Sequence, residues 1–125
     1  MKIREHLIKI TTDANGDSAD TSERSIFGHL IAVDVVDGTL ADNFDLTLTY
    51  VNSQGVTKTL LTLTNLSADA TYYPRHVLHG ETGTALTGTS GGDRTGPLVA
   101  GKVTVTTADG GATKSGAVIL YVGEN

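Results

Sequence analysis

The segment FDLTLTY, residues 44–50, decides the fold, because apolar and polar side chains alternate along it without interruption. Successive side chains of a β-strand point to opposite faces, so this pattern predicts a strand that buries its phenylalanine, leucines and tyrosine on one face. The segment KTLLTLT at 58–64 has a similar composition, and NSQG at 52–55 has the composition of a turn. The two segments are therefore predicted to pair as an antiparallel hairpin.

The same kind of pattern recurs along the chain, whereas the helical pattern matches poorly. Further strands are predicted at residues 7–11, 29–36, 72–78, 102–106 and 116–122. The dipeptide Asp109-Gly110 lies between the last two of these strands and predicts a second hairpin. The last strand is apolar on both faces, which indicates that it is central or that another chain covers it.

These strands predict an all-β fold over residues 1–125, namely a single-domain antiparallel β-sandwich or open barrel of about seven to eight strands. Residues 80–97 are rich in glycine and threonine and are predicted to form one long loop. Residues 1–6 are predicted to form an N-terminal arm, and Asn15-Gly16 is predicted to mark a turn within the polar segment 13–22.

Composition narrows the class of protein. The chain has 125 residues, enough for one domain with its own core, and no cysteine, which excludes disulfides and thiolate-bound metals. The net charge is −5 and the basic residues are scattered, which argues against a nucleic-acid partner. We find neither a signal peptide nor an apolar run of the ~20 residues that a membrane helix needs. We therefore expect a soluble protein with no membrane partner, made without a cleaved signal.

Three short motifs suggest chemistry but lack its context. GTSGG at 88–92 matches the serine hydrolase pattern G-x-S-x-G, but no helix follows it. DANGD at 13–17 resembles the start of a calcium loop without the later glycine and glutamate, so a solvated turn held by its own aspartate is expected. His76 and His79 would point to opposite faces of a strand, which disfavours a zinc site. We predict no catalytic, metal-binding or cofactor-binding residues, no cofactor and no enzyme activity.

Several segments together resemble a group of small tailed-bacteriophage proteins. These segments are LTLTNL at 61–66, ATYYPR at 70–75, HGETG at 79–83, PLVAGKV at 97–103 and GAVILYV at 116–122. In that group an LTLTN strand, a YYPR step and a Gly-rich segment precede a final pair of strands, and the YYPR step is the most specific part. The resemblance implies a structural protein of the virion, made in the host cytoplasm, with a capsid cement or decoration role.

The resemblance also implies the partners, which are the major capsid protein and copies of the chain itself. Cement proteins commonly form trimers, so a homotrimer is expected. Two alternatives stay open: a tail or connector structural protein, and, from another class, a carbohydrate-binding adhesion module. The last is disfavoured because the chain has no tryptophan and only four tyrosines to stack on sugars.

The YYPR step and its surroundings supply the candidate interface residues. Tyrosine and arginine are enriched at interaction hot spots, and the proline between them fixes a corner in the chain. The alternative for both tyrosines is that they close the core of the sandwich. The candidate interface residues are Tyr72, Tyr73, Arg75, His76, His79 and Arg94.

Overall fold

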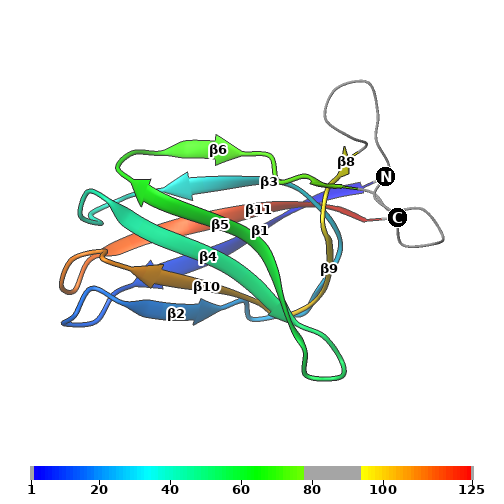
Figure 1. Cartoon of the computed structure of the whole chain (residues 1–125), viewed down its shortest axis with the longest axis horizontal. Coiled ribbons are helices and arrows are strands. Elements are labelled where there is room, and N and C mark those ends of the chain that lie inside the picture. Colours follow the sequence, from blue (N-terminus) through cyan, green and yellow to red (C-terminus); the bar gives the residue numbers. More distant parts are fainter. Residues whose placement is uncertain (1, 78–93, 125) are drawn as a thin grey trace.

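The computed structural model describes residues 2–77 and 94–124, which form two antiparallel sheets packed face to face and a separate two-stranded ribbon (Figure 1). The strands are β1 (Lys2–Thr11), β2 (Ser18–Thr21), β3 (Ile26–Val36), β4 (Phe44–Val51), β5 (Thr57–Leu66), β6 (Ala70–Tyr72), β7 (His76–Val77), β8 (Arg94–Thr95), β9 (Leu98–Gly101), β10 (Val103–Ala108) and β11 (Ser115–Glu124). The all-β sandwich prediction is confirmed. The two sheets hold nine strands, five and four, rather than seven to eight.

The order of the strands defines the topology. One sheet runs β1-β11-β3-β6, with β9 paired to another part of β3, and the other runs β2-β10-β4-β5. Eight strands remain when β7 to β9 are set aside. Among them the outermost in sequence pair with each other and the pairs nest inward: β1 with β11, β2 with β10, β3 with β6 and β4 with β5. This nested order is the jelly roll, a double-sheet sandwich made of two Greek keys.

The core lies between the sheets, as the alternation at 44–50 predicts. Phe44, Leu46 and Leu48 are fully buried and Tyr50 nearly so. β4 also pairs antiparallel with β5, as predicted. The remaining strands add mostly valine, leucine and isoleucine to the same cluster, so the core is largely aliphatic.

The predicted hairpin around Asp109-Gly110 is wrong, although β11 is central as expected. β10 pairs with β2 and β4, while β11 lies between β1 and β3 in the opposite sheet. The connection between them is held by other loops, because Gly110 donates its N–H to Gly16 O and accepts one from Ala41 N at its own carbonyl oxygen. The Asp-Gly turn therefore carries the chain from one sheet to the other.

Residues 2–6 are not a free arm, because they form the first half of β1 and pair with the end of β11. Lys2 lies opposite Glu124, and Arg4 Nε is 2.8 Å from Glu124 Oε2. Lys2, Arg4 and Glu5 are exposed on this strand.

The turn predicted at Asn15-Gly16 is present, but the polar segment 13–22 also contains a strand that was not predicted. Ser18–Thr21 forms β2 along β10, where Thr21 and Thr104 share a hydroxyl hydrogen bond of 2.9 Å. The strand predicted at 72–78 is two short strands, β6 and β7, separated by a break at 73–75.

Most of the Gly-rich segment predicted at 80–97 lies outside the described residues. The end of this segment, residues 94–97, is described. Arg94–Thr95 pairs with β7, and Pro97 is buried and accepts a hydrogen bond from Leu30 N at 2.9 Å.

Candidate interaction surfaces

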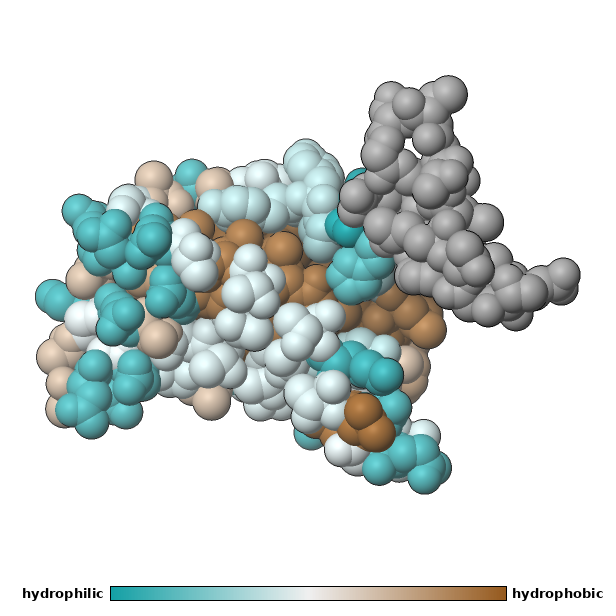
Figure 2. All heavy atoms as spheres, viewed as in Figure 1, coloured by the Kyte–Doolittle hydropathy of each residue, from teal (hydrophilic) through white to brown (hydrophobic). Residues whose placement is uncertain are grey.

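The two outer faces of the sandwich differ in chemistry. On the β2-β10-β4-β5 sheet the outward rows are mainly threonine, as in the pairs Thr47↔Thr62 and Thr49↔Thr59. Figure 2 looks onto this side, where pale, nearly neutral residues cover the strands. We call this surface the threonine face, comprising Thr21, Thr47, Thr49, Thr59, Thr62, Thr104 and Thr106.

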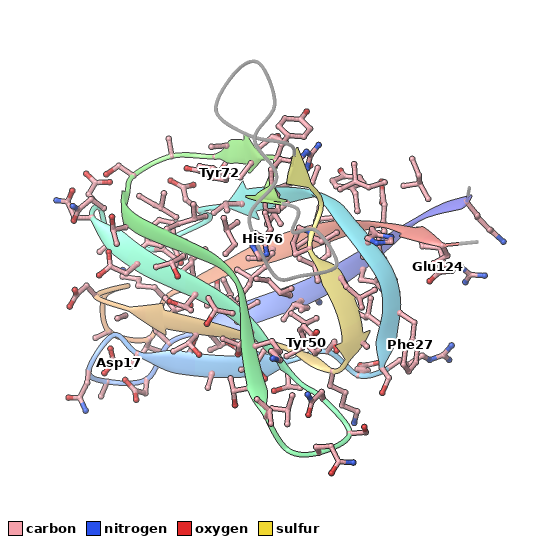
Figure 3. The ribbon with its side chains drawn as sticks, turned by 45° about the vertical axis from the view of Figure 1, so that its right-hand side comes forward. Asp17, Phe27, Tyr50, Tyr72, His76 and Glu124 are labelled. Atoms are coloured by element: carbon pink, nitrogen blue, oxygen red, sulfur yellow. The ribbon has the colours of Figure 1, made fainter. Side chains whose placement is uncertain are left out.

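The outer face of the β1-β11-β3 sheet carries most of the exposed large apolar side chains of the described residues, with the charged side chains of Glu5, Lys9 and Asp34 among them. Leu7 pairs with Ile119 across β1 and β11, and Phe27 and Leu98 extend the surface onto β3 and β9. Phe27 is 61% exposed and projects away from the sandwich, and Leu98 is 56% exposed (Figure 3). Contiguous exposed apolar surface is typical of sites that contact other molecules. We call this surface the apolar face, comprising Ile3, Leu7, Phe27, Val36, Leu98, Ile119 and Tyr121.

A hydrogen-bonded carboxylate lies within the apolar face. The Tyr121 hydroxyl donates to Asp34 Oδ2 at 2.7 Å, and the Thr71 hydroxyl donates to Asp34 Oδ1. The bond from Thr71, followed by that from Tyr121, lowers the pKa of Asp34 below its ordinary value. The bond to Asp34, followed by desolvation, raises the pKa of Tyr121 to about 12. The network ties β3, β6 and β11 together and fixes a carboxylate within the apolar face.

The Tyr72–Arg75 corner divides its two tyrosines between core and surface. Tyr72 is half-buried and packs against the core, whereas Tyr73 is 63% exposed. The Arg75 guanidinium lies 6.0 Å from the Tyr73 ring centroid, within reach of a cation–π contact. Arg75 Nη1 also donates to Ile31 O at 3.0 Å and Pro74 O at 2.7 Å, so the corner is fastened to β3.

The other candidate interface residues are less fully placed. His76 is exposed at the start of β7, close to the corner (Figure 3). Arg94 is described only through its backbone, which pairs with Val77, and His79 lies outside the described residues. The structure therefore brings Tyr73, Arg75 and His76 to one end of the molecule.

The sequence motifs have simpler roles. The Asp13 carboxylate accepts N–H bonds from Asn15 at 2.8 Å and Asp17 at 3.1 Å, which confirms the predicted aspartate-held turn. These bonds, with the one from Asp17 the largest effect, lower the pKa of Asp13. Over residues 2–77 and 94–124, no group of three or more histidines and carboxylates could hold a metal ion. The motif at 88–92 lies outside these residues.

Sequence reasoning missed the apolar face as a surface. The signal was present in residues 116–122, where apolar side chains on both faces indicated a strand covered by something else. Asp34, a single carboxylate inside the apolar run 29–36, was a second signal. No helix in the described part of the chain has the length and apolar character to cross a membrane.

The fold and its surfaces define a jelly-roll sandwich with one apolar and one threonine-rich outer face. No protein-family model and no curated protein matches the sequence. Among solved structures, a chain in the structure of infectious bursal disease virus, Gx strain, is similar at 16% identity and a TM-score of 0.32. The match covers 98% of this chain and 38% of that chain, and at this level of similarity it assigns neither family nor function.

Proposed function

We propose that this protein is a structural component of a bacteriophage virion and acts as a cement or decoration protein on the head shell. The observation that carries the proposal is the contrast between the two outer faces. A protein that lies on a shell needs one surface to bury and one to leave in water. The apolar face suits the first role and the threonine face the second.

Fold-level analogy and sequence resemblance support the same role. Jelly rolls are common in viral capsid proteins, although the fold by itself also serves other functions. The YYPR segment resembles small virion proteins, and Tyr73 and Arg75 form an exposed aromatic and cationic pair of the kind found at interface hot spots. The proposed partners are the major capsid protein and further copies of this chain, and the protein acts without catalysis or cofactor.

Copy number tests the place in the particle. Quantitative mass spectrometry of purified virions should find this protein in many copies, on the scale of the major capsid protein. A few copies per particle would instead favour the tail or connector alternative. Its absence from purified particles would refute a virion role.

Shell binding tests the proposed surface. Particles that lack the protein should bind the wild-type chain but not a Phe27→Asp/Leu98→Asp variant, because binding would then bury two carboxylates without partners. The matched control is Thr49→Asp/Thr106→Asp on the threonine face, which adds the same charge and should bind normally. Equal binding by both variants would show that the apolar face is not the contact surface.

A second candidate, carbohydrate binding, is favoured by one observation. A shallow hollow of about 380 Å³ is lined by Tyr73 and Tyr121 and also by Asp34 and Thr71, so rings and hydrogen-bonding groups lie together. Lectin domains also use jelly rolls. A glycan-array signal that is lost in Tyr73→Ala would support this function, and no signal from the wild-type chain would reject it.

A further inference from the structure

Within residues 2–77 and 94–124, β1 is a free sheet edge and pairs regularly along its whole length. It pairs with β11 on one side, from Lys2↔Glu124 to Thr11↔Ser115, without a register shift, and no described strand pairs with its other side. The other edges of the two sheets are short or irregular. β2 has four residues, β6 three and β9 four, and β5 is interrupted by two register shifts against β4. Short length and bulges normally protect edges from pairing with another chain, and β1 has neither.

The orientation of the β1 backbone follows from one hydrogen bond. Thr12, directly after β1, donates its N–H to Lys114 O at 2.9 Å and so continues the register with β11. Backbone groups of an antiparallel strand alternate in direction, so even-numbered residues of β1 address β11. The odd-numbered residues therefore direct their N–H and C=O groups toward the free edge. These residues are Ile3, Glu5, Leu7, Lys9 and Thr11.

The side chains of these residues are arranged symmetrically about Leu7. Glu5 and Lys9 are both exposed and lie two residues to either side of it on the same face. If two copies of β1 pair antiparallel about a two-fold axis at Leu7, each Glu5 faces the Lys9 of the other copy and the two Leu7 side chains meet. Opposite charges directly across a strand pair stabilise it.

We propose that β1 pairs in this way with β1 of a second copy of the chain and joins the two sheets into one. The register at Leu7 also places odd-numbered residues opposite each other, as exchange of both backbone hydrogen bonds requires. A two-fold axis at His6 would allow the same backbone hydrogen bonds between odd-numbered residues. It would place Glu5 opposite Leu7, however, and would form no pair of opposite charges. The charges therefore select the axis at Leu7.

The surroundings of the edge leave room for a partner. A hollow of about 540 Å³ lies between Glu5–Lys9 and Asp20–Arg24, alongside the free edge. His6 and Asp20 are among the residues that line this hollow, and within the described residues His6 Nε2 and Asp20 Oδ2 are buried without a hydrogen-bond partner. An incoming strand would project its own inward-facing side chains into this space.

The mass in solution is the first test. Sedimentation equilibrium of the purified chain should show a concentration-dependent change from 13.0 kDa to twice that mass. A monomer up to the highest soluble concentration would overturn the proposal. A homotrimer, the state expected from the resemblance, would overturn it as well.

Charge reversal tests the register. Glu5→Lys and Lys9→Glu each set like charges opposite one another at two places, so each should raise the dimer Kd by about tenfold to a hundredfold. The double variant restores opposite charges and should return the Kd close to that of the wild-type chain. Failure of this rescue would refute the axis at Leu7, because Glu5 and Lys9 are not neighbours within one copy.

Cross-linking gives a readout that does not depend on the strength of association. Paired Cα atoms at the axis would be about 5.5 Å apart, within disulfide range. The chain has no cysteine, so Leu7→Cys should give a disulfide-linked dimer under mild oxidation. Val51→Cys, also exposed but on β4, is the control and should stay monomeric. Equal cross-linking of both would contradict the proposal.

The proposed pairing of β1 with β1 of a second copy does not rest on the virion role. Either proposal can therefore fail while the other holds.

Discussion

Gly28 in β3 should be the glycine of the sandwich that tolerates a side chain least. Its φ of +145° lies in a region that residues with a side chain rarely adopt. An added Cβ would also lie 2.3 Å from Gly123 O and 2.9 Å from Val122 Cγ1. Since the nearest atom belongs to the backbone of β11, no side-chain rotation can relieve the clash, and the two strands would have to separate.

Gly55 provides a matched control for the backbone effect. It has a φ of +79° in the turn between β4 and β5, and nothing lies within 4 Å of the position of its Cβ. Gly55→Ala should therefore lose only about 1 kcal/mol of unfolding free energy, from the backbone conformation alone. For Gly28→Ala the backbone costs about 1–3 kcal/mol and overpacking another 1–3 kcal/mol, so a total loss of about 3 kcal/mol or more is expected.

Urea denaturation of the wild-type chain and both variants measures this difference. The slope of unfolding free energy against urea should stay constant while the midpoint of Gly28→Ala falls well below that of Gly55→Ala. If the two variants lost the same free energy within about 0.5 kcal/mol, the close approach of β3 to the end of β11 would be refuted.

Three further predictions concern buried and partly buried polar groups. Thr12 is almost fully buried, and its Oγ1 donates to Gly111 O at 2.6 Å and accepts a bond from Lys114 N at 2.8 Å. In denaturation experiments Thr12→Val should therefore lose about 1–3 kcal/mol, against less than about 0.5 kcal/mol for Thr106→Val on the threonine face. In a spectrophotometric titration, Asp34→Asn should bring the pKa of Tyr121 down from about 12 toward 10.0, and an unchanged titration would show that the bond is absent. Folding lowers the pKa of Asp34, so the ionised carboxylate stabilises the fold above its ordinary pKa of 3.8. This contribution is lost as the pH falls through the lowered pKa. The unfolding free energy of Asp34→Asn should therefore fall less steeply with acid than that of the wild-type chain.

Alternation along single strands could be predicted from the sequence, and pairing between distant strands could not. The row from Phe44 to Tyr50 is buried as expected, because the period of two belongs to the strand itself. The dipeptide Asp109-Gly110 wrongly predicted that the strands on either side of it pair with each other. The hairpin preference of Asp-Gly describes only the turn residues themselves and carries no information about distant strands. In the folded chain, Gly110 is bonded to the loops around Gly16 and Ala41, which lie far away in sequence.

The candidate interaction surfaces were also predictable only in part: residue types could be proposed from the sequence, but their positions on the surface could not. The tyrosines of the YYPR step could be proposed from residue type, but only the fold shows that Tyr72 turns to the core and Tyr73 to solvent. The apolar face could not be assembled from the sequence, since it depends on which strands lie next to β11. Leu7 and Ile119 become neighbours only through that pairing.

The pairing of the first strand with the last has a consequence for folding. Lys2 lies opposite Glu124, so β11 must be synthesised before β1 can pair with it. Closing so long a loop is entropically costly, and folds dominated by such distant pairs reach the native state in milliseconds to seconds rather than microseconds. During synthesis β1 therefore stays unpaired until β11 has left the ribosome, and over that interval both of its edges are open to pairing with other chains.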